Sequence, residues 1–212
     1  MTKTCLASAL MLALFLLSSC SQTTQPPAAG GDSAAKPAES SAAVAPVTAK
    51  TAYWEMYKLA YKWTPDILAL KLEPKEMPGF SNDGGKAAIW EGTFASPSQH
   101  SFRTFTYAIA AHPPDIYKGV TVADSIPWRG VTAEVMPIRM ADVSIDSDAA
   151  YSAATADAAE WLKKNPSKKL TSFQLGNGNA FPAPVWYFLW GDQKSGYAAF
   201  VNATTGKVLR KK

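Results

Sequence analysis

The sequence predicts an α+β fold made of two helix-strand-strand-strand repeats, with antiparallel sheets that are each covered by a helix. This prediction depends on the order of elements, which occurs once from Thr51 and again from Asp146. In each copy an apolar helical spacing comes first, and short apolar or alternating runs typical of strands follow it. A proline ends each predicted helix, Pro65 in the first copy and Pro166 in the second, because the residue before proline disfavours the helical conformation.

The first copy begins with a helix in which Trp54, Tyr57 and Tyr61 recur at helical spacing. Three strands are predicted after it, at residues 67–72, 86–95 and 101–110. A Ser-Asn-Asp-Gly-Gly sequence between the first two strands is typical of a tight turn.

The second copy begins at Asp146, where Ser147 and Asp148 are suited to the start of a helix. Alanines at 150, 154 and 158 mark the buried face of this helix, which we expect to end near Lys164. Three strands are predicted after it, at residues 170–175, 184–190 and 197–208. The order of elements in residues 51–110 is therefore repeated.

The two copies also place a tryptophan alike, because Trp90 in the first aligns with Trp186 in the second. We interpret the chain as a duplication, with residues 51–140 as the first repeat plus a connecting segment and residues 141–212 as the second. An extra strand is predicted near 131–143 within the connection. The alternative is one irregular α+β domain whose halves resemble each other by coincidence.

The chain's last strands surround the sequence Asn202-Ala203-Thr204-Thr205-Gly206. Asn202 or Thr204 can bond backbone groups of a turn, and Gly206 accepts a positive φ without a side-chain penalty. This ending resembles that of PepSY-type domains, which close on an Asp/Asn-x-x-Thr-Gly turn and a short strand. The resemblance covers residues 147–209 and is faint over 51–110. It implies a module that regulates envelope peptidases or mediates interactions, without catalytic residues. Asn202 replaces the more usual aspartate, which argues against an ion site there.

The N-terminus has the layout of a secretory signal, with Lys3 before an apolar run over residues 5–17. That run is too short to span a bilayer. The tetrapeptide Leu17-Ser18-Ser19-Cys20 resembles the lipobox of bacterial lipoproteins, which implies cleavage of residues 1–19 and acylation of Cys20 with palmitate-type chains. The alternative is an ordinary secretory signal with an incidental cysteine.

Residues 20–50 are dominated by Ala, Ser, Pro, Thr and Gly and contain no aromatic residue. Such a composition cannot build a core, so we expect a disordered tether with a reach on the order of 30 Å. Ser21 rather than an aspartate follows Cys20; by resemblance to enterobacterial sorting, this favours the outer membrane over the inner one. The protein is therefore expected at the cell envelope, lipid-anchored and facing the periplasm.

Several classes of chemistry are disfavoured by the composition. Cys5 is predicted to leave with the signal peptide and Cys20 to be acylated, so the mature chain has no thiol for catalysis, a disulfide or a metal. The net charge of +4 does not argue for nucleic-acid binding. The two histidines, His100 and His112, lie in predicted loops, and Asp115 is the one obvious third ligand for zinc. We expect no enzyme, metal or cofactor.

Binding is the predicted class of function, because all seven tryptophans lie after residue 50. The candidate partner or ligand surface is Trp128, Trp186, Tyr187 and Trp190. In the predicted strand 184–190, alternation places Trp186 and Trp190 on one face and Tyr187 on the other. Both faces are apolar, so either the strand is covered twice or one face is a docking surface. The expected partner is another envelope protein or a peptidase; the alternative is a small apolar or peptide ligand.

Overall fold

A computed structural model describes residues 44–210 of the chain. The predicted signal peptide, Cys20 and most of the predicted tether lie outside these residues. The helices are α1 (Ala49–Trp63), the short 3-10 helix η1 (Met140–Asp142) and α2 (Ser147–Lys164). The strands are β1 (Leu68–Lys75), β2 (Ile89–Ser96), β3 (Ser101–Ala108), β4 (Gly119–Val122), β5 (Ile126–Pro127), β6 (Leu170–Gly176), β7 (Val185–Trp190), β8 (Tyr197–Asn202) and β9 (Val208–Leu209). No helix in this part is long and apolar enough to cross a membrane.

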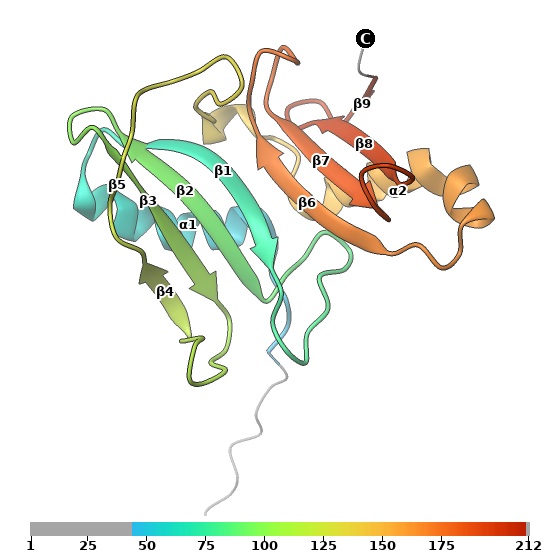
Figure 1. The fold of residues 1–212 in the computed structure, drawn as a ribbon, viewed down its shortest axis with the longest axis horizontal. Helices are drawn as coiled ribbons and strands as arrows, with labels where there is room; N and C mark the ends of the chain where they lie inside the picture. The colour runs from blue at the N-terminus through green and yellow to red at the C-terminus, as the bar shows by residue number, and fades with distance from the viewer. Residues whose placement is uncertain (1–43, 211–212) are drawn as a thin grey trace, which may run out of the picture. The chain divides into compact units, whose positions relative to one another are not determined.

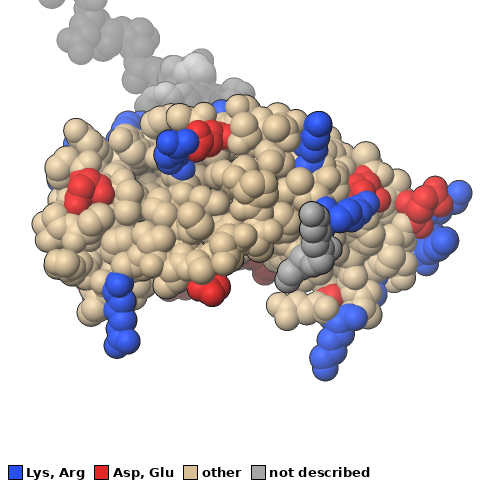
Figure 2. All heavy atoms as spheres, turned by 90° about the horizontal axis from the view of Figure 1, so that it is seen from above, with Lys and Arg blue, Asp and Glu red and all other residues tan. Residues whose placement is uncertain are grey.

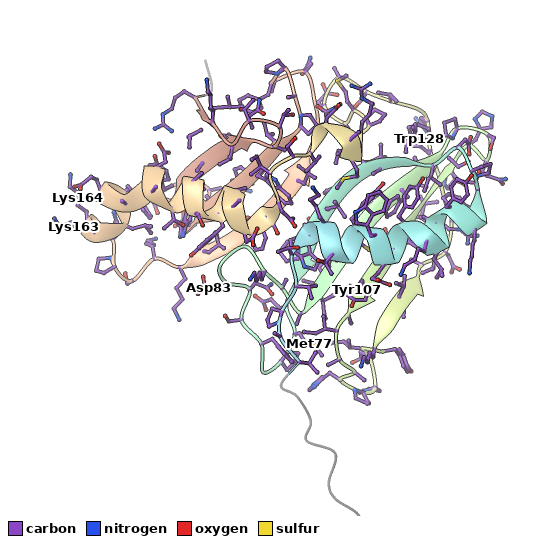
Figure 3. All side chains as sticks on the ribbon, turned by 180° about the vertical axis from the view of Figure 1, so that it is seen from behind. Met77, Asp83, Tyr107, Trp128, Lys163 and Lys164 are labelled. Carbon is purple, nitrogen blue, oxygen red and sulfur yellow. The ribbon has the colours of Figure 1, made fainter. Side chains whose placement is uncertain are left out.

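All nine described strands belong to one antiparallel sheet with the order β4-β3-β2-β1-β6-β7-β8-β9, and β5 pairs with β3. Both long helices lie behind the sheet in Figure 1 and in front of it in Figure 3, so they cover the same face. The α+β class is therefore confirmed. The sequence prediction of separate sheets was wrong, because β1 and β6 pair and join the two sets of strands.

The core between sheet and helices is rich in aromatic residues. Trp90 of β2 and Trp186 of β7 are both fully buried. Each indole N–H donates to a backbone carbonyl two residues before a helix: Trp90 to Val47 and Trp186 to Ile145, both at 2.9 Å. These bonds satisfy polar groups that would otherwise be costly to bury, and they fix the start of each helix against the sheet.

The N-termini of the two helices meet and share their capping groups. Asp146 Oδ1 accepts the backbone N–H of Ser147 at 2.7 Å and that of Lys50 at 3.1 Å. The buried Ser147 hydroxyl accepts the backbone N–H of Ala49 at 2.9 Å. The first N–H groups of a helix have no partner within the helix, so residues of α2 satisfy the start of α1. The cap of α2 is therefore Asp146 rather than the predicted Ser147, and Asp146 and Ser147 both accept N–H groups from the start of α1.

The folded part begins earlier than predicted. Val47 pairs with Ala87 through two backbone bonds of 3.0 Å, and α1 starts at Ala49 rather than Thr51. Residues 44–50 therefore belong to the folded unit and not to the tether. The contacts group the described residues 44–210 into one compact unit.

The connecting segment differs from the prediction as well. No strand forms within 131–143, where a backbone bridge between Ile138 and Ala69 is the one sheet-like contact described. Instead, β4 and β5 pair with β3 earlier in the connection. At the C-terminal end, the predicted turn is confirmed: Asn202 Oδ1 accepts the N–H groups of Thr204 and Thr205 at 2.9 Å.

Seen from above, the visible surface is mainly neutral, with lysine and arginine side chains spread between acidic ones (Figure 2). This face carries no concentrated basic patch of the kind that nucleic-acid binding uses.

Candidate functional site

The candidate site is a cleft in the middle of the sheet, where β1 and β6 separate. The two strands pair at two positions only, Lys71 with Gly176 and Leu72 with Leu175. Beyond them, residues 73–75 of β1 and 170–174 of β6 line a cleft of about 1000 Å³. Pro74 has no N–H and cannot extend the ladder across this gap.

The loop of residues 76–83 forms another wall of the cleft. Met77 anchors this loop, because it is buried in a small second core with Ile89 and Ile109. At the other end, Asn82 donates to the Lys75 carbonyl at 3.1 Å and Asp83 accepts the Tyr151 hydroxyl of α2 at 3.0 Å. The loop is thus fastened both to β1 and to α2.

Gly85, next to this loop, permits a close approach to α2. It has φ of +72°, and an added Cβ would lie 2.2 Å from the Ser147 carbonyl oxygen. No other residue type fits there, both because of this contact and because positive φ disfavours L side chains. The loop and the start of α2 are therefore packed directly against each other.

The β1 wall is charged. Glu73 lies 3.1 Å from the Lys71 ammonium and 2.9 Å from that of Lys75, which also lies 3.4 Å from Glu91. Partial burial raises the pKa of Glu73, but the hydrogen bonds and charges of Lys75 and Lys71 outweigh it, so the net pKa is lowered. The hydrogen bond to Glu73 raises the pKa of Lys75. Glu73 and Lys75 are therefore both charged at neutral pH.

The opposite wall combines an aromatic floor with a polar rim. Phe173 and Trp190 are buried side chains that line the cleft, together with Tyr151 from α2. The Tyr151 and Trp190 rings lie 6.2 Å apart. At the rim, Lys168 reaches Asp192 at 3.2 Å. The site therefore offers apolar contact in its depth and charged groups at its mouth.

The edge of β6 is open along the cleft. No described backbone group of residues 170–174 bonds to residues 73–75. In an antiparallel sheet, alternate residues direct their N–H and C=O groups to opposite neighbours. Some of residues 170–174 therefore present backbone donors and acceptors to the cleft. Thr171 and Ser172 are exposed there, so this edge is accessible.

The sequence-predicted surface residues do not form one site. Trp186 is fully buried, so its prediction as a partner surface was wrong. Trp190 is also buried, but it lines the cleft. Tyr187 is half-buried on the sheet face opposite the helices and packs on Phe200, with ring centroids 5.2 Å apart.

Trp128, labelled in Figure 3, is half-buried and directly follows β5, which pairs with β3. Strands β2, β1 and β6 separate β3 from β7, which carries the other three residues. Sequence reasoning missed the cleft itself. The available signal was Pro74, a proline in a strand that turns out to be central.

The histidines do not assemble a site in the described part. His100 and His112 are both exposed in loops, and His100 has φ of 49°, within the hairpin between β2 and β3. Among residues 44–210, no group of three acidic, histidine or cysteine side chains could hold a metal.

Comparisons with known proteins add little. No protein family matches the sequence, and no curated protein matches it. One solved structure is similar, that of a candidate lipoprotein from Clostridium difficile 630. It is 10% identical, with a TM-score of 0.45 over 75% of this chain and 90% of that one. A likeness this weak carries no argument about function.

Proposed function

We propose that this chain is a non-enzymatic, lipid-anchored module of the cell envelope that binds an extended segment of another envelope protein in the cleft between β1 and β6. The observation that carries the proposal is the open edge of β6, where the sheet ladder stops after two residue pairs. An envelope peptidase is the partner class that the PepSY resemblance of residues 147–209 suggests.

An open strand edge is suited to strand addition. An extended peptide that pairs with residues 170–174 gains main-chain hydrogen bonds, while the flanking side chains select its sequence. The aromatic floor of Phe173, Trp190 and Tyr151 would receive an apolar side chain of that peptide. The lysines Lys168 and Lys169 at the rim favour an acidic residue beside it.

A small apolar ligand is a poorer fit to this cleft. Such ligands bind in largely enclosed pockets with few polar groups. Here the walls carry Glu73, Lys75, Lys168 and Lys169. The charged walls therefore support a peptide rather than an apolar molecule.

Duplication is part of the same proposal. Trp90 and Trp186 occupy matching strands, and both donate to the carbonyl two residues before their helix. If the two halves arose from one module, fusion produced the β1–β6 seam, and the cleft is a consequence of the two halves being joined over only two residue pairs.

The test of the cleft is site-specific photo-crosslinking in intact envelopes. A photoreactive residue at Gln174, which lines the cleft, should give discrete adducts with one protein partner. The matched control is Ser152, an exposed residue of α2 that does not line the cleft. Equal adduct yields at the two positions, or none at Gln174, would contradict the proposal.

The test of the anchor is separate. Cells given labelled palmitate should incorporate it into the wild-type chain but not into Cys20→Ala, because Cys20 supplies the acylated thiol. The mass of the mature N-terminal peptide reports the cleavage site. Incorporation into Cys20→Ala would place the lipid elsewhere or remove the lipoprotein assignment.

A further inference from the structure

The outer face of α1 carries an aromatic stripe, defined here as Trp54, Tyr57 and Tyr61. Trp54 and Tyr61 are 50% and 52% exposed, although such large apolar surfaces are normally buried. The rings contact one another: Trp54 and Tyr57 have centroids 5.4 Å apart, and Tyr57 and Tyr61 stack at 5.9 Å. The stripe is therefore a continuous, ordered ledge along the helix.

Lysines accompany the stripe on the same outer face of α1. Lys58 and Lys62 are both exposed, and Lys58 pairs with Glu55 at 2.6 Å. Rings of Trp and Tyr beside lysines are the side chains enriched where proteins meet the headgroup region of a bilayer. The composition of this face is typical of an interfacial helix rather than of a solvated one.

The position of α1 along the chain agrees with this. Among the described residues it is the first element after the predicted lipid at Cys20, and 28 residues lie between Cys20 and Ala49. A chain of that length and composition reaches on the order of 30 Å. The anchor would therefore keep α1 within reach of the headgroups.

We infer that the aromatic stripe rests on the headgroup region of a phospholipid bilayer and orients the domain on the membrane. The inference rests on the proposed lipid anchor but not on the proposed cleft. Aromatic rings at the interface add apolar burial, and the lysines add attraction to anionic lipid. A single orientation would then turn the mouth of the cleft in a fixed direction relative to the membrane.

The test uses the purified acylated protein in vesicles of phosphatidylcholine and phosphatidylglycerol with nitroxide-labelled acyl chains. Wild-type protein that floats with the vesicles should show quenching of its tryptophan fluorescence by the nitroxides. The same protein solubilised in detergent should show none. Trp54→Ala should reduce the quenched signal about twofold or more, since Trp54 is the tryptophan in the stripe. Trp128→Ala is the matched control, a half-buried tryptophan outside the stripe, and should leave the quenching unchanged.

The outcomes separate the two proposals. Protein that floats without quenching, or that is quenched equally after Trp54→Ala, overturns the stripe's role and leaves the lipid anchor intact. Protein that does not float at all overturns both. Sedimentation in detergent measures the oligomeric state. If wild type is a dimer and Trp54→Ala is a monomer, the stripe binds a second copy of the chain, and the membrane contact is overturned.

Discussion

The two halves of the sheet have the same order of elements but differ in where their large buried side chains lie, on the helix in one half and on the strand in the other. In the first half, α1 buries Tyr53 and Met56. The strand makes room for them with Gly92, where an added Cβ would lie 3.0 Å from the Met56 methyl carbon and 2.7 Å from the Phe94 ring. A large residue on the helix therefore requires the smallest one on the strand.

In the second half the sizes are reversed. The buried hydrophobic face of α2 is Ala150, Ala154 and Ala158. Gly92 lies two residues after Trp90, and the corresponding position two residues after Trp186 is Phe188, which is fully buried. Both arrangements fill the layer between sheet and helix, as close packing of protein interiors requires. One backbone plan thus accepts two distributions of volume.

The outer faces differ too. Helix α1 presents the aromatic stripe, whereas α2 presents small or charged residues such as Ser152, Ala156 and Glu160, all exposed. Both helices therefore cover the same face of the sheet, but the surfaces that they expose differ. Four predictions test this comparison, from the largest expected effect to the smallest.

The shared part of the plan is tested by Trp90→Ala and Trp186→Ala. Each removes a fully buried indole and its hydrogen bond to a backbone carbonyl, so each should lower the free energy of unfolding by about 3–5 kcal/mol. Urea denaturation measures both. If one variant lost little stability while the other unfolded, the equivalence of the halves would be refuted.

The reversed packing is tested by Ala154→Leu in α2. Ala154 is fully buried in the same core as Phe188, so overpacking should cost about 1–3 kcal/mol. The control on the same helix is Ala156→Leu, which is exposed and should change stability little. In α1, Met56→Leu conserves volume and should cost less than about 1.5 kcal/mol. A tolerated Ala154→Leu would show that α2 can move away from the sheet.

The shared capping is tested by Ser147→Ala. This change leaves the buried N–H of Ala49 without its acceptor and should cost about 1–2 kcal/mol. Ser152→Ala is the control, since Ser152 bonds only a carbonyl within its own helix. Amide hydrogen exchange should report faster opening at the start of α1, in the half of the protein that was not mutated.

The smallest effect concerns pH. In the folded protein the pKa of Asp157 is lowered, first by the hydrogen bond from Arg210 and also by that from Tyr197. A lowered pKa contributes stability above the ordinary value of 3.8, and this stability is lost as pH falls through the folded-state pKa. Asp157→Asn should therefore be less stable than wild type at pH 6, and the difference should shrink toward pH 2.

A matching carboxylate in the first half extends this test. The Thr64 hydroxyl and the backbone N–H of Ser98 donate to Asp66 and lower its pKa. The stability difference between wild type and Asp66→Asn should likewise become smaller as the pH is lowered. If the difference in stability between wild type and either variant grew larger toward low pH, the lost interaction would not involve the ionised carboxylate.

Much of the fold was predictable because the local signals are strong. The helical spacing, the alanine face at 150, 154 and 158 and the proline stops place both helices within two residues of their observed starts. Six strand regions followed from apolar or alternating runs, but β4 and β5 were not predicted, and the predicted strand 197–208 is divided into β8 and β9. The pairing between β1 and β6 could not be predicted. It joins Leu72 to Leu175, more than 100 positions apart, and no local sequence pattern encodes such a contact.

The site was less predictable for a related reason. Trp186 and Phe188 occupy one apolar strand face, and only tertiary packing decides whether such a face is covered. The cleft is made by an absence of pairing between distant strands, which leaves Pro74 as its sole local trace. Strand 131–143 was wrongly predicted because its apolar residues do not find a partner strand, and Ile138 alone bridges Ala69.

The shared cap has a consequence for how the protein acquires its structure. The groups that complete the first turn of α1 come from Asp146 and Ser147, nearly 100 residues later in the chain. Until residues 146–147 have been synthesised, the first turn of α1 therefore lacks these groups, and long-range contacts of this kind form slowly. The halves should gain stability together in one cooperative transition. A chain truncated after β5 would expose the unpaired edge of β1 and leave α1 without its capping groups, rather than form a half-sized domain.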